Sequence, residues 1–152
     1  MNIRKAVEED IAALILMRWE FTLEHHPEVG DDFELFATEC REFLAQAIQG
    51  ERWHIWVAEL DGIIVSHVYI QLIDKVPRPG RTTYPFAYMT NVYTDPDYRS
   101  QGIGSHMLET IRAWAEANRF EFMIVWPSEE SRDFYARNGY TLCNDPMEFQ
   151  LK

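Results

Sequence analysis

One segment of the chain, residues 86 to 127, restricts the fold more than any other. It begins with a stretch rich in β-branched and aromatic residues, 86 to 94, which predicts a strand. After a loop with two glycines, apolar residues recur at helical spacing at Met107, Leu108, Ile111, Trp114 and Ala115. The uninterrupted apolar run 122 to 126 then predicts a second strand, covered on both faces. Because a helix usually connects parallel neighbours, the two strands are expected to pair in parallel.

The remaining patterns place this unit in a mixed sheet. A short strand is expected at residues 2 to 7, and helical periodicity follows after Asp10 and again after Gly30. Strands 53 to 59 and 63 to 73 flank Asp61-Gly62, a pair that favours a tight hairpin turn. A short helix from Ser128 to Asn138 and a final strand from 140 to 151 complete the order βααβββαβαβ. We therefore predict an α+β (α/β) fold with a mixed, mostly antiparallel sheet of six to seven strands and about four helices.

The length and composition indicate one domain over residues 1 to 152. The chain is 47% hydrophobic and 26% charged, within the range of ordinary globular domains, and contains no repeat or linker. Cys40 and Cys143 lie far apart in sequence and are interpreted as reduced thiols. The N-terminus lacks the pattern of a secretory signal, and no apolar run reaches the roughly 20 residues of a membrane span. A cytoplasmic protein with no membrane partner is expected.

The charge balance restricts the partners further. Fourteen Lys and Arg face 25 Asp and Glu, a formal net charge of −11. Binding of phosphate polymers depends on clustered basic residues, so nucleic acid is not expected as a partner, and a cationic substrate is easier to accommodate. His25 and His26 are adjacent and would point in different directions on a helix, and no carboxylate stands at zinc-like spacing. No metal site is predicted.

The loop between the strand ending at Thr94 and the helical pattern beyond Gly104 suggests an anion site. Gly102 and Gly104 allow backbone N–H groups to gather around a phosphate at the positive end of a helix, and Arg99 can add a charged donor. Such glycine pairs also occur in ordinary turns. A Walker P-loop would require a lysine here, and a dinucleotide fingerprint would require a third glycine where Met107 stands. Both of these nucleotide motifs are therefore excluded.

Two longer motifs resemble a known family. Residues 92 to 104, Val-Tyr-Thr-Asp-Pro-Asp-Tyr-Arg-Ser-Gln-Gly-Ile-Gly, are similar to the acetyl-CoA-binding motif of the GNAT superfamily of N-acyltransferases, and Ser131 to Tyr140 resembles the family's later helix and turn. The resemblance implies splayed central parallel strands, with a bulged strand that holds the pantetheine arm of the cofactor. It implies acetyl-CoA as cosubstrate and these cofactor-binding residues: Val92, Tyr93, Thr94, Arg99, Ser100, Gln101, Gly102, Ile103, Gly104, Ser105, Ser131 and Tyr135.

The same resemblance implies a mechanism in which an amine attacks the thioester directly. Tyr135 matches the tyrosine that many relatives use as general acid beside the leaving sulfur, and the Val92 amide is a candidate donor to the oxyanion. Several relatives place a carboxylate on the strand before the loop, but this chain has Asn91 there. Asn91 can orient water or the amine but cannot act as base, which leaves a water chain or an acid elsewhere, such as Glu24 or Asp74.

The acceptor is expected to bind near the segment between the first two helices. That segment is aromatic and acidic, with Trp19, Phe21, Glu24, His26, Glu28, Asp31 and Asp32, and could hold a small cationic amine, although solvated acids explain the charges nearly as well. A non-catalytic acyl-CoA sensor of the same fold is the alternative from another class, and an acyltransferase acting on hydroxyl groups is a further one. Homodimerisation is the usual expectation for such folds.

Overall fold

The computed structural model describes residues 1–30 and 32–151 and contains a five-stranded sheet flanked by helices. The strands are β1 (Asn2–Lys5), β2 (Trp53–Leu60), β3 (Ile63–Ile73), β4 (Phe86–Thr94) and β5 (Met123–Val125). The α-helices are α1 (Ile11–His25), α2 (Phe33–Gln49), α3 (Ile103–Ala117) and α4 (Arg132–Arg137), and four 3₁₀ turns lie between them: Glu8–Asp10, Pro27–Val29, Pro96–Tyr98 and Glu129–Ser131. The predicted order of elements is confirmed through α4.

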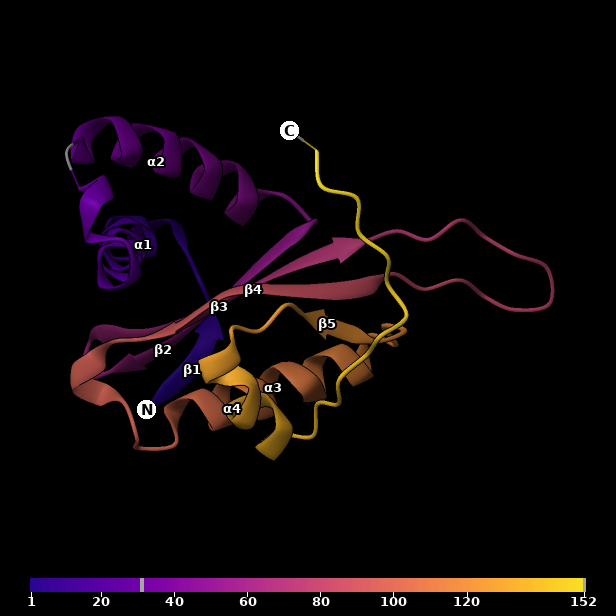
Figure 1. Ribbon diagram of the computed structural model, residues 1–152. Helices are drawn as coiled ribbons and strands as arrows, with labels where there is room; N and C mark the ends of the chain where they lie inside the picture. The colour runs from indigo at the N-terminus through magenta and orange to yellow at the C-terminus, as the bar shows by residue number, and fades with distance from the viewer. Residues whose placement is uncertain (31, 152) are drawn as a thin grey trace.

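The sheet follows the order of the chain, β1-β2-β3-β4-β5, with antiparallel pairs throughout except for the parallel pair β4–β5. Helices α1 and α2 cover one face of the sheet, and α3 and α4 cover the other (Figure 1). The predicted hairpin turn between β2 and β3 is present: Asp61 and Gly62 both have positive φ, 51° and 81°. The mixed sheet with helices on both faces is therefore as the sequence predicts.

Two apolar clusters hold the layers together. On the α3 face, Met107 and Ile111 pack against Val68, Ile70 and Met89 of the sheet, and all five are essentially inaccessible to solvent. On the other face, the buried cluster includes Leu14 of α1, Leu44 of α2, and Val57 and Tyr69 of the sheet. Strands β2 and β3 contribute side chains to both clusters, so both of their faces are buried. Among the described residues, no helix is both long and apolar enough to cross a bilayer.

The predicted final strand is wrong. Residues 140–151 are extended without strand pairing, so the described part of the chain has five strands rather than six to seven. The cause is the lack of a partner ladder: β5 pairs over only three residues, and Leu142, Met147 and Phe149 of the tail are 74%, 99% and 86% exposed. Apolar alternation alone does not make a strand when no neighbouring edge accepts its hydrogen bonds.

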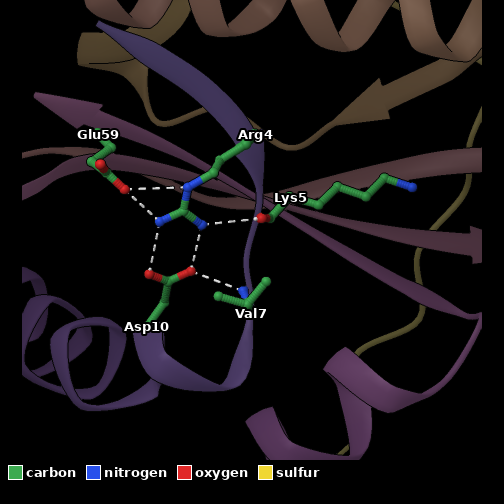
Figure 2. Close-up of polar contacts among 5 residues, drawn as sticks. All are labelled: Arg4, Lys5, Val7, Asp10 and Glu59. Atoms are coloured by element: carbon green, nitrogen blue, oxygen red, sulfur yellow. Dashed lines mark hydrogen bonds and ion pairs between the residues drawn. The ribbon is translucent and has the colours of Figure 1, made fainter. Parts of the chain in front are cut away.

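An ion-pair network anchors β1 to the start of α1 and to β2 (Figure 2). The Arg4 guanidinium donates to both carboxylate oxygens of Asp10, at 2.7 and 3.0 Å, and to Glu59 at 2.6 Å. The Val7 amide also donates to Asp10 at 2.8 Å. Burial raises the pKa of Asp10, but the bonds from Arg4 and Val7 outweigh it, so the pKa is lowered overall. Asp10 is thus a buried charge with three donors and is anionic in the folded protein.

Candidate active site

A cavity of about 740 Å³ lies where β4 leaves its neighbour β5. Its wall is formed by one side of α1, by residues 88–94 of β4, by the loop leading into α3, and by the segment from the end of β5 through α4. Most of the residues that the sequence predicts for the site meet here: Glu24, Asn91, Val92, Tyr93, Thr94, Arg99, Ser100, Gly102, Ile103, Gly104, Ser105, Ser131 and Tyr135. Three parts of the chain, α1, β4 to the start of α3, and the end of β5 to α4, therefore converge on one cavity.

A β-bulge in β4 forms the centre of this cavity. His67 of β3 pairs with Tyr93, and Tyr69 pairs with Thr90, so two steps along β3 correspond to three steps along β4. The extra residue is accommodated at Asn91, whose φ is 50°, an uncommon value for a residue with a side chain. The bulge redirects the backbone of β4 at the point where the resemblance implies that the acyl group lies.

The bulge coincides with the divergence of the two parallel strands. β4 pairs with β5 only from Ala87 to Met89, although β4 continues to Thr94. Beyond Met89, the side of β4 that faced β5 therefore turns toward the cavity instead of a neighbouring strand. An extended ligand with amide groups can bind such an open strand side as an added strand does.

His67 was not predicted from the sequence, yet it supports the bulge directly. Its side chain is fully buried, and its Nδ1–H donates to the Asn91 carbonyl at 2.8 Å. Nε2 of the same ring has no hydrogen-bond partner among the described residues. Burial lowers the pKa of His67 to about 4, so the imidazole is neutral near pH 7. The sequence offered one signal for a special role of His67: the polar pair Ser66-His67 stands within the largely apolar strand β3.

The N-terminus of α3 supplies a site for an anion. Gly102 caps the helix in the left-handed conformation, with φ of 81°, and the first amide bonded back to it is that of His106, at 3.1 Å. The amides of residues 103–105 precede the first intrahelical bond and are free for a ligand. Gly104 faces Phe134 of α4, and a Cβ at this glycine would lie 3.0 Å from the Phe134 ring. The two glycines thus have different uses: one shapes the cap, and the other lets α4 approach.

Arg99 and Glu24 form an ion pair at the cavity wall. The guanidinium donates to both carboxylate oxygens at 2.6 and 2.9 Å, and its Nε donates to the Thr94 carbonyl at 2.8 Å. The bond from Arg99 lowers the pKa of Glu24. Arg99 is therefore occupied by α1 rather than free for a phosphate. The suggestion that Glu24 accepts the proton of the amine also loses support, because a paired carboxylate of low pKa is a weak base.

Asn91 has a neighbour that the sequence did not indicate. Its amide oxygen accepts a hydrogen bond from Arg18 of α1 at 3.2 Å, and the Arg18 guanidinium lies 5.7 Å from the centre of the Phe21 ring. Phe21 in turn stacks on Tyr93, with 4.8 Å between ring centres. Arg18 and Phe21 thus connect α1 to the bulged strand and form part of the cavity wall.

Tyr135 lies at the opposite side of the cavity, on α4. Its side chain is buried, with the rings of Phe134 and Tyr140 at 5.1 and 5.5 Å. Burial, followed by the charge of Tyr140, raises the pKa of Tyr135 to about 12, and no hydrogen bond contributes to that shift. The phenol is therefore fully protonated near pH 7 and can donate a hydrogen bond into the cavity.

Six described residues predicted for the site do not line the cavity: Trp19, His26, Glu28, Asp32, Asp74 and Gln101. Trp19 packs between α1 and α2, 5.2 Å from Phe33 and 5.6 Å from Phe36. His26 pairs with Glu28, and Asp74 pairs with Arg52. Of the other acids expected at the acceptor, Asp32 caps α2 by accepting from the Leu35 amide at 2.9 Å, and Asp31 lies outside the described residues. Apart from Glu24, the described acids of this group thus form a helix cap and ion pairs away from the cavity.

A bulged strand that parts from its parallel neighbour beside a glycine-capped helix is the arrangement that the resemblance to the GNAT acyltransferases implies. The family model described as Acetyltransferase (GNAT) family matches residues 13–140, and the chain belongs to this family. It is an acetyl-CoA-dependent N-acetyltransferase, as the two sequence motifs predicted.

Similar proteins agree with this placement. The fold matches a predicted acetyltransferase with acetyl-CoA from Clostridium acetobutylicum, with a TM-score of 0.79 and 24% identity over 98% of this chain and 95% of the other. It also matches an aminoglycoside acetyltransferase from an uncultured soil metagenomic sample in complex with trehalose, with a TM-score of 0.75 and 19% identity over 99% and 95%. A 37-residue segment is 40% identical to an aminoglycoside N(6′)-acetyltransferase type 1 from Acinetobacter genomosp. 13, and it spans about a quarter of either chain, 24% and 25%.

Proposed function

We propose that the protein transfers an acetyl group from acetyl-CoA to a primary amine of a small acceptor, by direct attack in a ternary complex. The observation that carries this proposal is the continuity of the cavity. It runs from the cap of α3, past the bulge at Asn91, to Arg18 and Phe21 of α1. Cofactor and acceptor can therefore occupy the two ends and meet at the bulged strand, without a covalent enzyme intermediate.

The cofactor end has a suitable group for each part of acetyl-CoA. The pyrophosphate would bind the amides of residues 103–105 at the positive end of α3. The pantetheine arm would lie along β4, with backbone groups of Val92 and Thr94 as its hydrogen-bond partners. Ser131 is held by Ser128 through two hydrogen bonds of 3.0 Å, so it contributes to the rim of the cavity more than to a direct contact.

Two groups on opposite sides of the cavity would act on the thioester. The amide of Val92, at the bulge, would donate to the developing oxyanion. Tyr135 would donate a hydrogen bond to the departing sulfur. Full proton transfer from Tyr135 is unfavourable: its pKa of about 12 exceeds the roughly 8.5 of an ordinary thiol. Tyr135 then acts chiefly as a hydrogen-bond donor that stabilises the thiolate.

The amine must lose a proton before it attacks. At pH 7 an alkyl amine of pKa near 10.4 is largely protonated. Asn91 has no basic group, and Glu24 is engaged by Arg99. A chain of water molecules leading out of the cavity is the path that remains, with the Asn91 side chain orienting the amine or a water.

A small amine is the acceptor class that the surroundings support. Phe21, Tyr88 and Trp126 add aromatic surface to the cavity wall, and the rings of Tyr88 and Trp126 meet edge to face with 5.0 Å between their centres. The similarity to two aminoglycoside acetyltransferases makes amines of small molecules the first class to test. A cationic acceptor has little support, because the acids expected to bind it lie outside the cavity or in the pair with Arg99.

Release of free CoA from acetyl-CoA tests the proposal. Wild-type protein is incubated with acetyl-CoA and a panel of small amines, matching alcohols and short peptides, and the acetylated product is identified by mass. We expect turnover with one or more small amines, well above hydrolysis without acceptor. Turnover only with alcohols or peptides would contradict the proposed acceptor class. Stoichiometric stabilisation by acetyl-CoA with no turnover would indicate the non-catalytic sensor.

A further inference from the structure

Arg18 is the basic residue at the acceptor end of the cavity that lacks an acidic partner. It projects from α1 beside the bulge, where its Nη1 donates to the Asn91 side chain at 3.2 Å. Within residues 1–30 and 32–151, no carboxylate forms an ion pair with it, whereas nearby Arg99 is fully engaged by Glu24. One neutral amide oxygen uses only one of the five N–H donors of a guanidinium. The remaining donors are available to a ligand.

Two neighbours contact the Arg18 guanidinium, whose side chain is otherwise exposed to solvent. The Phe21 ring lies 5.7 Å from the guanidinium carbon, and the bond to Asn91 holds the other side. The charge of Arg18 also shifts the pKa values of two buried groups of β3, His67 and Tyr69. Burial is the main cause of the lowered pKa of His67, and Arg18 lowers it further. Burial raises the pKa of Tyr69, and Arg18 opposes that change. Both effects are those expected of a positive charge near these two buried groups.

We infer that Arg18 binds an anionic group of the acceptor, so that the preferred acceptors are amines that also carry a carboxylate. This inference rests on the proposed function and specifies its substrate class. A planar carboxylate matches the fork of N–H donors in arginine, and such charge-assisted bonds fix orientation as well as affinity. With its carboxylate on Arg18, an acceptor would place its amine beside Asn91, next to the bulge where the thioester is expected.

The net charge of the chain bears on this assignment. A chain of formal charge −11 repels anions at long range, so a free anion has no advantage in approaching it. A zwitterionic amino acid or similar acceptor carries no net charge, and it experiences that field weakly. Recognition then depends on the local contact with Arg18, which acts within a few ångströms. The inference thus favours amino acids with no net charge over dicarboxylic amino acids, which are net negative.

Matched acceptor pairs test the inference. Each pair differs only by a carboxylate: lysine and cadaverine, tyrosine and tyramine, histidine and histamine. The quantity measured is the ratio of kcat/KM between the two members, from acetyl-CoA-dependent CoA release. For the wild type we expect the carboxylate-bearing member of the accepted pair to be preferred by roughly ten- to a hundredfold, the range of a charge-assisted hydrogen bond. In Arg18→Gln the ratio should fall toward one, and Arg18→Lys should retain part of the preference.

The ratio separates recognition from general damage. Loss of the Arg18–Asn91 bond affects both members of a pair alike, so it does not change the ratio. Arg112→Gln on α3 is the matched control, because Arg112 is 66% exposed, pairs with Glu116 and lies outside the cavity; its ratio should equal that of the wild type. Equal kcat/KM for both members of a pair in the wild type, or an unchanged ratio in Arg18→Gln, would overturn this inference. Either result would leave the proposed function intact. If wild-type protein acetylates no amine, the proposed function fails, and the inference fails with it.

Discussion

The imidazole Nδ1–H of His67 donates a 2.8 Å hydrogen bond to the backbone carbonyl of Asn91. Asn91 has φ of 50° and lies at the bulge where β4 leaves β5, so a buried side chain of one strand fixes the unusual backbone of its neighbour. If the adjacent Val92 amide donates to the oxyanion, His67 is a positioning residue for that donor. A few tenths of an ångström at such a donor change its contribution to catalysis.

His67→Leu should therefore impair catalysis as well as folding. It leaves the Asn91 carbonyl without its donor, which we expect to cost about 1–3 kcal/mol in the free energy of unfolding. We also expect kcat at saturating acetyl-CoA to fall roughly tenfold or more. His54→Leu is the control. His54 lies in β2, away from the cavity, and its ring contacts the Glu51 carbonyl at 3.0 Å. Equal kcat in the two variants would show that His67 serves stability alone.

The pKa of His67 also predicts a pH dependence of stability. The folded value of about 4 lies below the ordinary 6.5, so the unfolded chain binds the extra proton first. Stability is then fully present above pH 6.5 and decreases as the pH falls toward 4, by up to about 3 kcal/mol. Urea denaturation at pH 7, 5.5 and 4.5 measures this slope. His67→Gln should have a smaller slope over that range, and an identical slope would contradict the prediction.

Gly102→Ala should weaken the binding of CoA beyond its effect on stability. Gly102 and Gly62 have the same φ of 81°, and an added Cβ meets no protein atom within 4 Å at either position. Both alanine variants should therefore lose about 1 kcal/mol of stability to backbone strain. Only the methyl of Gly102→Ala enters the anion site at the α3 cap. Calorimetric titration should give roughly tenfold weaker CoA binding for Gly102→Ala and an unchanged affinity for Gly62→Ala; equal affinities would place the pyrophosphate elsewhere.

Tyr135→Phe should lower kcat with little change in the KM for acetyl-CoA. The phenol donor acts on the thiolate that forms during the reaction, so its loss raises the barrier by more than it weakens substrate binding. We expect kcat to fall by about ten- to a hundredfold. Tyr140→Phe is a close control, because Tyr140 is a neighbouring ring whose pKa burial also raises to about 12. A kcat for Tyr135→Phe equal to that of Tyr140→Phe would exclude the donor role.

Asp10→Asn should destabilise the fold without affecting the site. The substitution removes the charge that accepts from Arg4 and Val7, and we expect a loss of about 2–3 kcal/mol at pH 7. The lowered pKa of Asp10 means that its contribution is present above the ordinary value of 3.8 and is lost as the pH falls below it. The difference in stability between wild type and variant should therefore shrink as the pH falls below 3.8. Glu116→Gln, which breaks an exposed pair on α3, should differ from wild type by less than about 0.5 kcal/mol.

Local patterns predicted most of the fold because they agree with the tertiary contacts. The periodicity of residues 107 to 115 matches the buried face of α3, and Asp61-Gly62 forms the turn that its residues favour. The tail from residue 140 differs, because strand formation depends on a partner edge that no local pattern reveals. The glycine motif indicated an anion site at the start of α3 from the sequence alone, because the helix, its cap and its loop are contiguous in sequence.

The acceptor end could not be predicted in this way, since its residues come together only through packing. Arg18 and Asn91 are 73 positions apart, and His67 contacts Asn91 across two strands. The number of acids near Glu24 suggested a site for a cationic amine, but the role of each carboxylate depends on its nearest partner in the fold. The bidentate bond from Arg99 changes Glu24 from a candidate base into a structural anion. Charge counts indicate what a surface attracts, whereas ion pairs determine which charges remain available.

The early separation of β4 from β5 also has a consequence for backbone exchange. Beyond Met89, the amides of β4 on that side face the cavity, so in the free protein they are open to exchange with deuterium from the solvent. A pantetheine arm bound as an extra strand would shield them. Mass measurement of deuterium uptake over residues 90–94 would then report cofactor occupancy directly, through protection of backbone amides that the sheet itself leaves unpaired.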